Sequence, residues 1–244
     1  MCTVTYIPIE TGKFILTSNR DERIVRPTNS PITESINGTN VFFPRDGQAG
    51  GTWIAAGDNG RVCCLLNGAF EKHKRKELYS KSRGKIVLEA FEFDNLSEFF
   101  QNVALDDVEP FTLIVVDNSE QSKLYEFRWD GNKKHLIELD ILIPKIWSSA
   151  TLYSKQVRDE RELWFGDWLS KQNLLKGGVV LNFHSFPHGN DTENDVIMDR
   201  NNGLKTVSIT QIECSLDSFK MEYHDLVKEQ KITLTKEIKR NSYA

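Results

Sequence analysis

The stretch MCTVTYIPIETGKFILTSNRDE, residues 1–22, decides how the fold begins. Residues 3–7 and 13–17 are rich in β-branched and aromatic side chains, and Glu10-Thr11-Gly12 between them is typical of a turn. The two runs therefore predict a β-hairpin. If its turn is centred near residue 11, the numbers of paired residues sum to about 21 or 22.

Cys2 is the first residue of this stretch that could carry chemistry. In the predicted register it lies opposite Asn19 or Arg20. Removal of Met1 would give Cys2 a free α-amine with a reference pKa of about 7.7 to 8.0, which could take the thiol proton before the sulfur attacks a carbonyl. The alternative is that Cys2 is a small apolar residue at the start of a buried strand.

Asn19-Arg20-Asp21-Glu22 forms a run of four polar residues directly after an apolar strand. Arg20 would favour a nearby thiolate, while Asp21 or Glu22 would hold an α-amine or the amide nitrogen of a substrate. The run is equally typical of a solvated strand end, where Arg20 pairs with a neighbouring acid.

A second hairpin is predicted from the apolar runs 53–56 and 62–66 around an Asp58-Asn59-Gly60 turn. Asn67 follows it and could donate a hydrogen bond to an oxyanion, although Asn-Gly is also a common turn dipeptide. Cys63 and Cys64 are adjacent in a predicted strand and should point to opposite faces, which argues against a shared metal or a mutual disulfide.

The order of the remaining predicted elements indicates the fold class. Residues 23–40, with Pro27, Pro31 and many Ser, Thr and Asn, predict an irregular loop. Because strands are followed by helices and then strands again, we expect one domain of antiparallel sheets with helices on their outer faces. Helices are predicted over about 82–92, 96–105 and 154–171, and strands over 111–117, 122–129, 134–139, 204–213 and 219–227.

Composition limits the classes of function. The formal net charge of -4 disfavours general binding of nucleic acid by a basic surface. The cysteines at 2, 63, 64 and 214 lack the CxxC spacing of a zinc site and favour a reducing compartment. With no signal-peptide pattern and no membrane-spanning apolar run, we expect a cytoplasmic protein without integral membrane insertion.

Two further segments suggest ligands only weakly. His184 and His188, in His-Ser-Phe-Pro-His, invite a metal or haem hypothesis, but Pro187 disfavours a regular helix there and loop histidines are usually solvated. The basic run at residues 72–76 is typical of a solvated loop, and its place after Asn67 leaves attraction of an anionic ligand open.

Four blocks of the first 70 residues share an order and spacing with a known family. They are Met1-Cys2-Thr3, Ser18 to Glu22, Gly50-Gly51-Thr52-Trp53-Ile54-Ala55, and Asn59-Gly60-Arg61 leading into Leu66-Asn67. Together they resemble the NRDE family, which includes Transport and Golgi organisation proteins. That family is in turn similar to the choloylglycine hydrolase and penicillin acylase group, whose members begin with Met-Cys-Thr. The resemblance implies a four-layer αββα sandwich of two antiparallel sheets, as in N-terminal-nucleophile (Ntn) hydrolases.

The resemblance also implies roles for particular residues. Cys2 takes the position of the nucleophile, with Arg20, Asp21, Glu22 and Asn67 as further catalytic residues. Expected substrate-binding residues are Asn19, Trp53, Ser148, Ser149 and Lys205. Ser148 or Ser149 falls near a second oxyanion-hole position, and Lys205 near a late arginine of those hydrolases.

The expected function is hydrolysis of a linear amide bond in a small-molecule substrate, with no cofactor and no metal. The rival reading is a non-catalytic carrier that uses the same pocket for haem or an acyl metabolite. Under that reading the basic run and the two histidines would matter more than Cys2.

Overall fold

The computed structural model describes residues 3–119 and 121–239 and forms the predicted N-terminal hairpin. Strand β1 (Thr3–Glu10) pairs with β2 (Lys13–Arg23), and Thr3 lies opposite Asn19, which is one of the two predicted registers. Cys2 lies outside the described residues. The hairpin therefore places the first described residue of β1 beside the polar end of β2.

The hairpin belongs to a six-stranded antiparallel sheet, sheet A, with the order β10-β1-β2-β11-β12-β13. β1 and β2 lie inside this sheet because strands from much later in the chain pair with both of them. These later strands are β10 (Lys145–Ser148), β11 (Leu204–Cys214), β12 (Ser218–Asp225) and β13 (Gln230–Glu237).

The second sheet, sheet B, has seven antiparallel strands in sequence order from β3 to β9. Each strand pairs with the next strand along the chain, although one of the connections is long enough to hold two helices. Its strands are β3 (Thr28–Ile36), β4 (Thr39–Asp46), β5 (Ile54–Gly57), β6 (Arg61–Asn67), β7 (Phe111–Asp117), β8 (Lys123–Trp129) and β9 (Lys134–Leu139).

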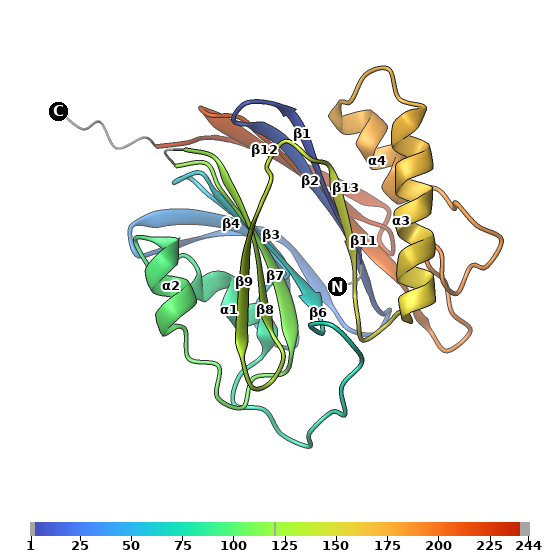
Figure 1. Ribbon diagram of the computed structural model, residues 1–244, viewed down its shortest axis with the longest axis horizontal. Coiled ribbons are helices and arrows are strands. Elements are labelled where there is room, and N and C mark those ends of the chain that lie inside the picture. The colour runs from blue at the N-terminus through green and yellow to red at the C-terminus, as the bar shows by residue number, and fades with distance from the viewer. Residues whose placement is uncertain (1–2, 120, 240–244) are drawn as a thin grey trace.

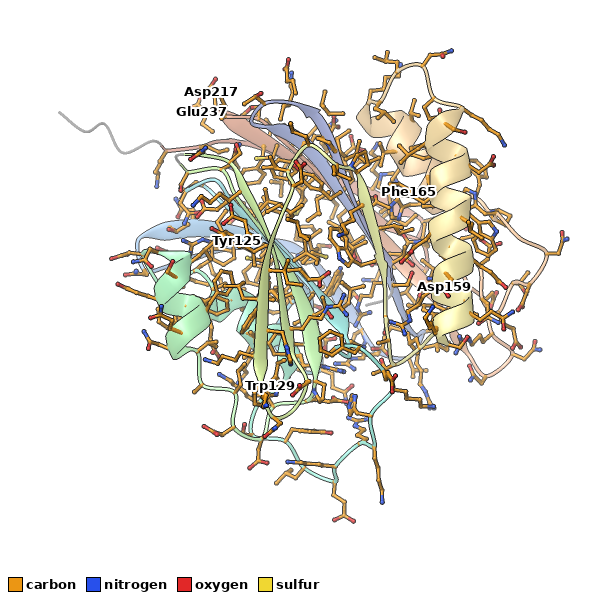
Figure 2. All side chains as sticks on the ribbon, in the orientation of Figure 1. Tyr125, Trp129, Asp159, Phe165, Asp217 and Glu237 are labelled. Atoms are coloured by element: carbon orange, nitrogen blue, oxygen red, sulfur yellow. The ribbon has the colours of Figure 1, made fainter. Side chains whose placement is uncertain are left out.

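Helices cover the outer face of each sheet, which gives four layers in the order helix, sheet, sheet, helix (Figure 1). Helices α1 (Arg83–Glu89) and α2 (Leu96–Asn102) lie on sheet B. Helices α3 (Lys155–Ser170) and α4 (Gly177–Ser185) lie on sheet A, and Figure 2 shows Phe165 of α3 between helix and sheet. None of the helices in the described part of the chain is long and apolar enough to span a membrane.

The alternation of side chains along the strands separates three cores. Val4, Leu16 and Cys64 pack between the two sheets. Cys63, the neighbour of Cys64, points to the opposite face and packs under α1 and α2, as predicted from its position. Ile7 and Ile15 point outward from sheet A into the core beneath α3 and α4.

Two predicted loops are ordered elements instead. Residues 28–36 form an edge strand, where the register shift between Asn29 and Pro31 accommodates the proline. His184 lies inside α4 and is fully buried, so the predicted solvated loop is wrong at this histidine. The helix ends at Ser185, before Pro187.

Candidate functional site

The polar ends of several strands meet at one end of the sandwich. Thr3 pairs with both Asn19 and Ser148, and Lys205 lies opposite Glu22 on the neighbouring strand β11. Sheet B reaches the same place, because the Ser149 hydroxyl donates a 2.9 Å hydrogen bond to the carbonyl oxygen of Asn67 at the end of β6. The fold therefore brings predicted site residues from four distant segments together.

Strand alternation divides the Asn19-Arg20-Asp21-Glu22 block between two faces of sheet A. The side chain of Asn19 points outward to α4, where its amide donates to the carbonyl oxygens of His184 and Val196 at 3.1 and 2.8 Å. Arg20 and Glu22 point inward, toward sheet B. Asn19, expected to bind substrate, thus braces the helical layer behind the sheet.

Asp21 is a buried carboxylate held by two hydroxyl groups. Tyr153 donates to its Oδ2 and Thr206 to its Oδ1, both at 2.6 Å. The guanidinium of Arg161 stacks 3.6 Å from the centre of the Tyr153 ring and donates a 2.6 Å bond to the Thr3 hydroxyl. These contacts fix Asp21, Tyr153 and the start of β1 relative to one another.

Arg20 forms a buried ion pair across the gap between the sheets. Its Nη2 lies 2.8 Å from Asp46, and its guanidinium lies 4.6 Å from the centre of the Trp53 ring. Burial raises the pKa of Asp46, but a hydrogen bond from the Ala49 backbone and the charges of Arg26 and Arg20 outweigh it, so this pKa lies below its ordinary value. Arg20 is thus committed to a carboxylate of sheet B.

A cavity of about 1180 Å³, here called the large cavity, opens beside this ion pair. Three predicted site residues line it, namely Glu22, Trp53 and Asn67. The described contacts leave the Asn67 side-chain amide without a hydrogen-bond partner, so it is available to a ligand. Residues 75–85, which run from the loop after β6 into the first turn of α1, form much of the rest of the wall.

A second cavity of about 720 Å³, here called the small cavity, is lined by residues that include Ser148 and Tyr153. Its wall is more apolar and includes Leu66, Phe70 and Trp147. Leu66 lines the small cavity and the next residue, Asn67, lines the large one. The hydrogen bond from Ser149 to Asn67 therefore lies between the small cavity and the large cavity, whose walls differ in polarity.

Close backbone contact fixes one rim of the large cavity. The Thr52 amide donates to the Gly84 carbonyl oxygen at 3.1 Å, and a Cβ on Gly51 would lie 2.5 Å from the Gly84 carbonyl carbon. Only glycine fits at residue 51 without displacing α1. This contact explains the glycine next to Thr52-Trp53 in structural terms.

The two predicted histidine ligands make hydrogen-bond contacts inside the protein. The ring nitrogens of His184 lie 2.7 Å from the Thr5 hydroxyl and 2.6 Å from the Asn19 amide oxygen, and His188 Nε2 lies 2.7 Å from the Phe183 carbonyl oxygen. These contacts occupy the nitrogens that a haem iron would need. Among residues 3–119 and 121–239, no three His, Cys, Asp or Glu side chains cluster as a metal site.

Several residues at this end have no obvious signal in the sequence. Tyr153 and Arg161 touch the site from the loop before α3 and from α3 itself, and Asp46 belongs to sheet B. Tyr153 lies 132 residues from its partner Asp21, and Arg161 lies 158 residues from its partner Thr3. Asp46 lies 26 residues from Arg20, so no local sequence pattern pairs any of them. Only the fold reveals these contacts.

The sequence profile of the family described as Transport and Golgi organisation 2 matches residues 1–151, which is more than half of the chain. The chain belongs to this family. The match covers β1 to β10 and ends near Tyr153, so it includes the polar block of β2 and Asn67. No curated protein gives a significant match to this member of the Transport and Golgi organisation 2 family.

Solved structures show the same fold at low sequence identity. Conjugated bile acid hydrolase from Clostridium perfringens, solved as its C2A variant, is 10% identical with a TM-score of 0.59, and the alignment covers 99% of this chain and 97% of that one. The Caenorhabditis elegans ortholog of N-acylethanolamine-hydrolyzing acid amidase is 13% identical with a TM-score of 0.55, covering 86% and 92%. Penicillin V acylase from Agrobacterium tumefaciens is 10% identical with a TM-score of 0.50, covering 96% and 86%. These likenesses confirm the expected α+β sandwich of Ntn hydrolases for this family member.

Proposed function

We propose that the protein hydrolyses a linear amide bond with Cys2 as its nucleophile. The observation that carries the proposal is the meeting of strand ends at one end of the sandwich, where β1 begins at Thr3, paired with Asn19 and Ser148. Ser148 lines the small cavity there, and Glu22 and Asn67 line the large cavity. Even-numbered residues of β1 such as Val4 face the space between the sheets, and Cys2 shares their parity. The three structural neighbours are by name a hydrolase, an acylase and an acid amidase.

The proposed reaction has two steps. The Cys2 thiol gives its proton to the α-amine, and the sulfur attacks the amide carbonyl to form a tetrahedral oxyanion. The C–N bond then breaks, the leaving amine takes the proton, and a thioester remains. Water adds to the thioester carbonyl, and the carbon–sulfur bond breaks to release the acid and restore the thiol.

Described residues supply supporting roles for this reaction. Asn67 has an uncommitted side-chain amide at the end of β6 and would donate to the oxyanion. Asp21, fixed by Tyr153 and Thr206, would orient the α-amine. Arg20 would contribute positive charge that favours thiolate, although its own nearest carboxylate is Asp46.

The rival function, a haem or acyl-metabolite carrier, would use the same cavities without turnover. Both proposed histidine ligands are engaged in hydrogen bonds inside the protein, which weighs against haem ligation by these two residues. An acyl chain could still occupy the small cavity with its apolar wall.

Intact mass before and after iodoacetamide tests the nucleophile at pH 7. Cys63, Cys64 and Cys214 are buried, and burial raises the pKa of each of these thiols to about 12, so they should stay unlabelled in the folded protein. We expect loss of Met1 and a single adduct that is absent from Cys2→Ala. Retained Met1, or labelling that survives Cys2→Ala, would refute the proposed hydrolase.

A further inference from the structure

Three arginines converge on the large cavity from three different segments. Arg26 follows β2, while Arg75 and Arg83 belong to the loop before α1 and to its first turn. Burial lowers the pKa of Arg83, Glu109 opposes this, and the positive charges of Arg75 and Arg26 lower it further, so the three groups lie within electrostatic range. Like charges held this close repel unless a negative charge lies among them.

Two acidic side chains near these arginines each already contact two basic side chains. Glu109 contacts both Arg83 and His73 at 3.2 Å. Asp46 contacts both Arg20 and Arg26, at 2.8 and 2.9 Å. Arg26 also pairs with Glu22, but no ion pair of the described residues involves Arg75, Arg23 or Lys85, which also line the cavity.

The charge balance of the wall is accordingly positive. Its six basic residues face four acidic residues, which gives a difference of two positive charges. The basic residues are Arg23, Arg26, Arg75, Lys81, Arg83 and Lys85, and the acidic residues are Glu22, Asp46, Glu77 and Glu109. Two residues outside the wall form ion pairs with it: Arg20 pairs with Asp46, and Glu89 pairs with Lys81. Because one is basic and the other acidic, counting them leaves the excess of two positive charges unchanged.

Buried hydrogen-bond donors without partners provide a second, independent observation. Trp53 lines the large cavity and is 3% exposed, yet its indole Nε1 has no acceptor in the described part of the chain. The Ser82 hydroxyl, on the same wall, is also buried and unpartnered. A buried donor left unsatisfied costs about 1–3 kcal/mol, so acceptor oxygens of a ligand would be favourable here.

We propose that the large cavity binds the anionic end of a ligand, a phosphate or carboxylate group, through Arg75 and Arg83 with Trp53 and Ser82 donating. Planar guanidinium groups match the paired oxygens of both anions. That this anion belongs to the amide substrate rests on the proposed function. Binding of the anion itself does not.

Isothermal titration with inorganic pyrophosphate and with succinate, at constant ionic strength and pH 7, tests the site in the full-length protein. The two probes distinguish phosphate from carboxylate. Arg75→Gln should weaken binding of the preferred probe by about fivefold or more, because an unpaired, exposed guanidinium is lost without a core contact. Lys171→Gln removes one charge at the C-terminal cap of α3, outside the residues that line the cavity, and should leave affinity unchanged.

Two further measurements keep the test decisive. Quenching of tryptophan fluorescence by the probe should disappear in Trp53→Phe, and Arg83→Gln should weaken binding in protein that still unfolds cooperatively. Absence of binding by both probes, or equal affinities in Arg75→Gln and Lys171→Gln, would overturn the proposal.

The outcome is separable from that of the hydrolase test. Cys2→Ala should bind the anion as the natural chain does, because no proposed contact involves the thiol. Anion binding by a protein whose Cys2 is unreactive would reject the hydrolase and keep the anion site. A reactive Cys2 without anion binding would do the reverse.

Discussion

Neighbouring residues of the polar block on β2 serve different parts of the molecule. Asp21 faces the helical layer, where the hydroxyl groups of Tyr153 and Thr206 hold its two oxygens. Arg20 faces sheet B and pairs with Asp46. One position along the strand therefore separates a carboxylate that fixes the start of β1 from a cation that joins the sheets.

Replacement of Tyr153 by Phe isolates one of these contacts. Tyr153→Phe keeps the ring beneath Arg161 and removes only the hydroxyl that donates to buried Asp21. We expect the free energy of unfolding to fall by about 1–2 kcal/mol, and labelling of Cys2 by iodoacetamide to slow most near pH 7, where part of the amine is neutral and can take the thiol proton. Urea unfolding and a pH series of labelling rates measure the two effects.

The control is Tyr125→Phe on β8, which is partly exposed and remote from Asp21. It should change stability by no more than about 0.5 kcal/mol. Equal stability and equal labelling profiles in both variants would show that Tyr153 does not position Asp21.

At this scale the sequence predicts the candidates but only some of their surroundings. The hairpin register of Thr3 and Asn19 follows from a local turn, so it can be predicted. The outward direction of Asn19 depends on which face carries α4, a helix that no sequence signal predicted. Lys205 meets Glu22 only because β11 returns to β2 from far along the chain.

Two of the elements that escaped prediction, β3 and α4, have polar or conformationally unfavourable sequences. β3 is an edge strand with one exposed face, so its composition matches that of a loop. α4 begins with Gly177-Gly178 and continues with Val179-Val180, all poor helix formers. Burial of Val180, Phe183 and His184 against sheet A stabilises this helix despite its composition.

The contact between Gly51 and α1 predicts a large effect of one methyl group. Gly51→Ala places a Cβ 2.5 Å from the Gly84 carbonyl carbon, so the rim must shift. We expect a loss of about 2 kcal/mol or more in unfolding free energy and weaker binding in the large cavity.

Gly166→Ala in α3 is the matched control, since a Cβ there meets nothing within 4 Å. It should raise stability by about 0.5–1 kcal/mol because alanine favours a helix. A Gly51→Ala protein as stable as the natural chain in chemical denaturation would exclude the tight contact.

At the scale of the whole molecule, a buried polar connection joins sheet A to its helices. His184 of α4 contacts Thr5 of β1 and Asn19 of β2 and is fully buried. Burial, together with the positive charges of His188 and Arg161, lowers the pKa of His184 to about 3. The folded protein therefore keeps this imidazole neutral over the pH range in which the unfolded chain protonates it.

The free energy of unfolding should therefore fall as the pH is lowered below about 6.5, the ordinary pKa of histidine. Between about pH 6 and 4 the unfolded chain binds a proton at His184 and the folded chain does not, so unfolding free energy drops by about 1 kcal/mol per pH unit. Urea unfolding at several pH values measures the slope, which should be smaller in His184→Gln. His135→Gln, at a partly exposed position on β9, should alter it far less, and equal slopes in the natural chain and His184→Gln would contradict the assignment.

Because the two sheets have different strand orders, we expect them to assemble at different times during synthesis. Every strand of sheet B pairs with its immediate neighbour in the chain, so that sheet can assemble as soon as β9 emerges from the ribosome. The first hairpin is made earliest but acquires its central partner, β11, only after residue 214 has been translated. Until β10 pairs with β1 and β11 pairs with β2, the edges of this hairpin stay open, so we expect the N-terminal strands to be the part of sheet A that waits longest for its partners.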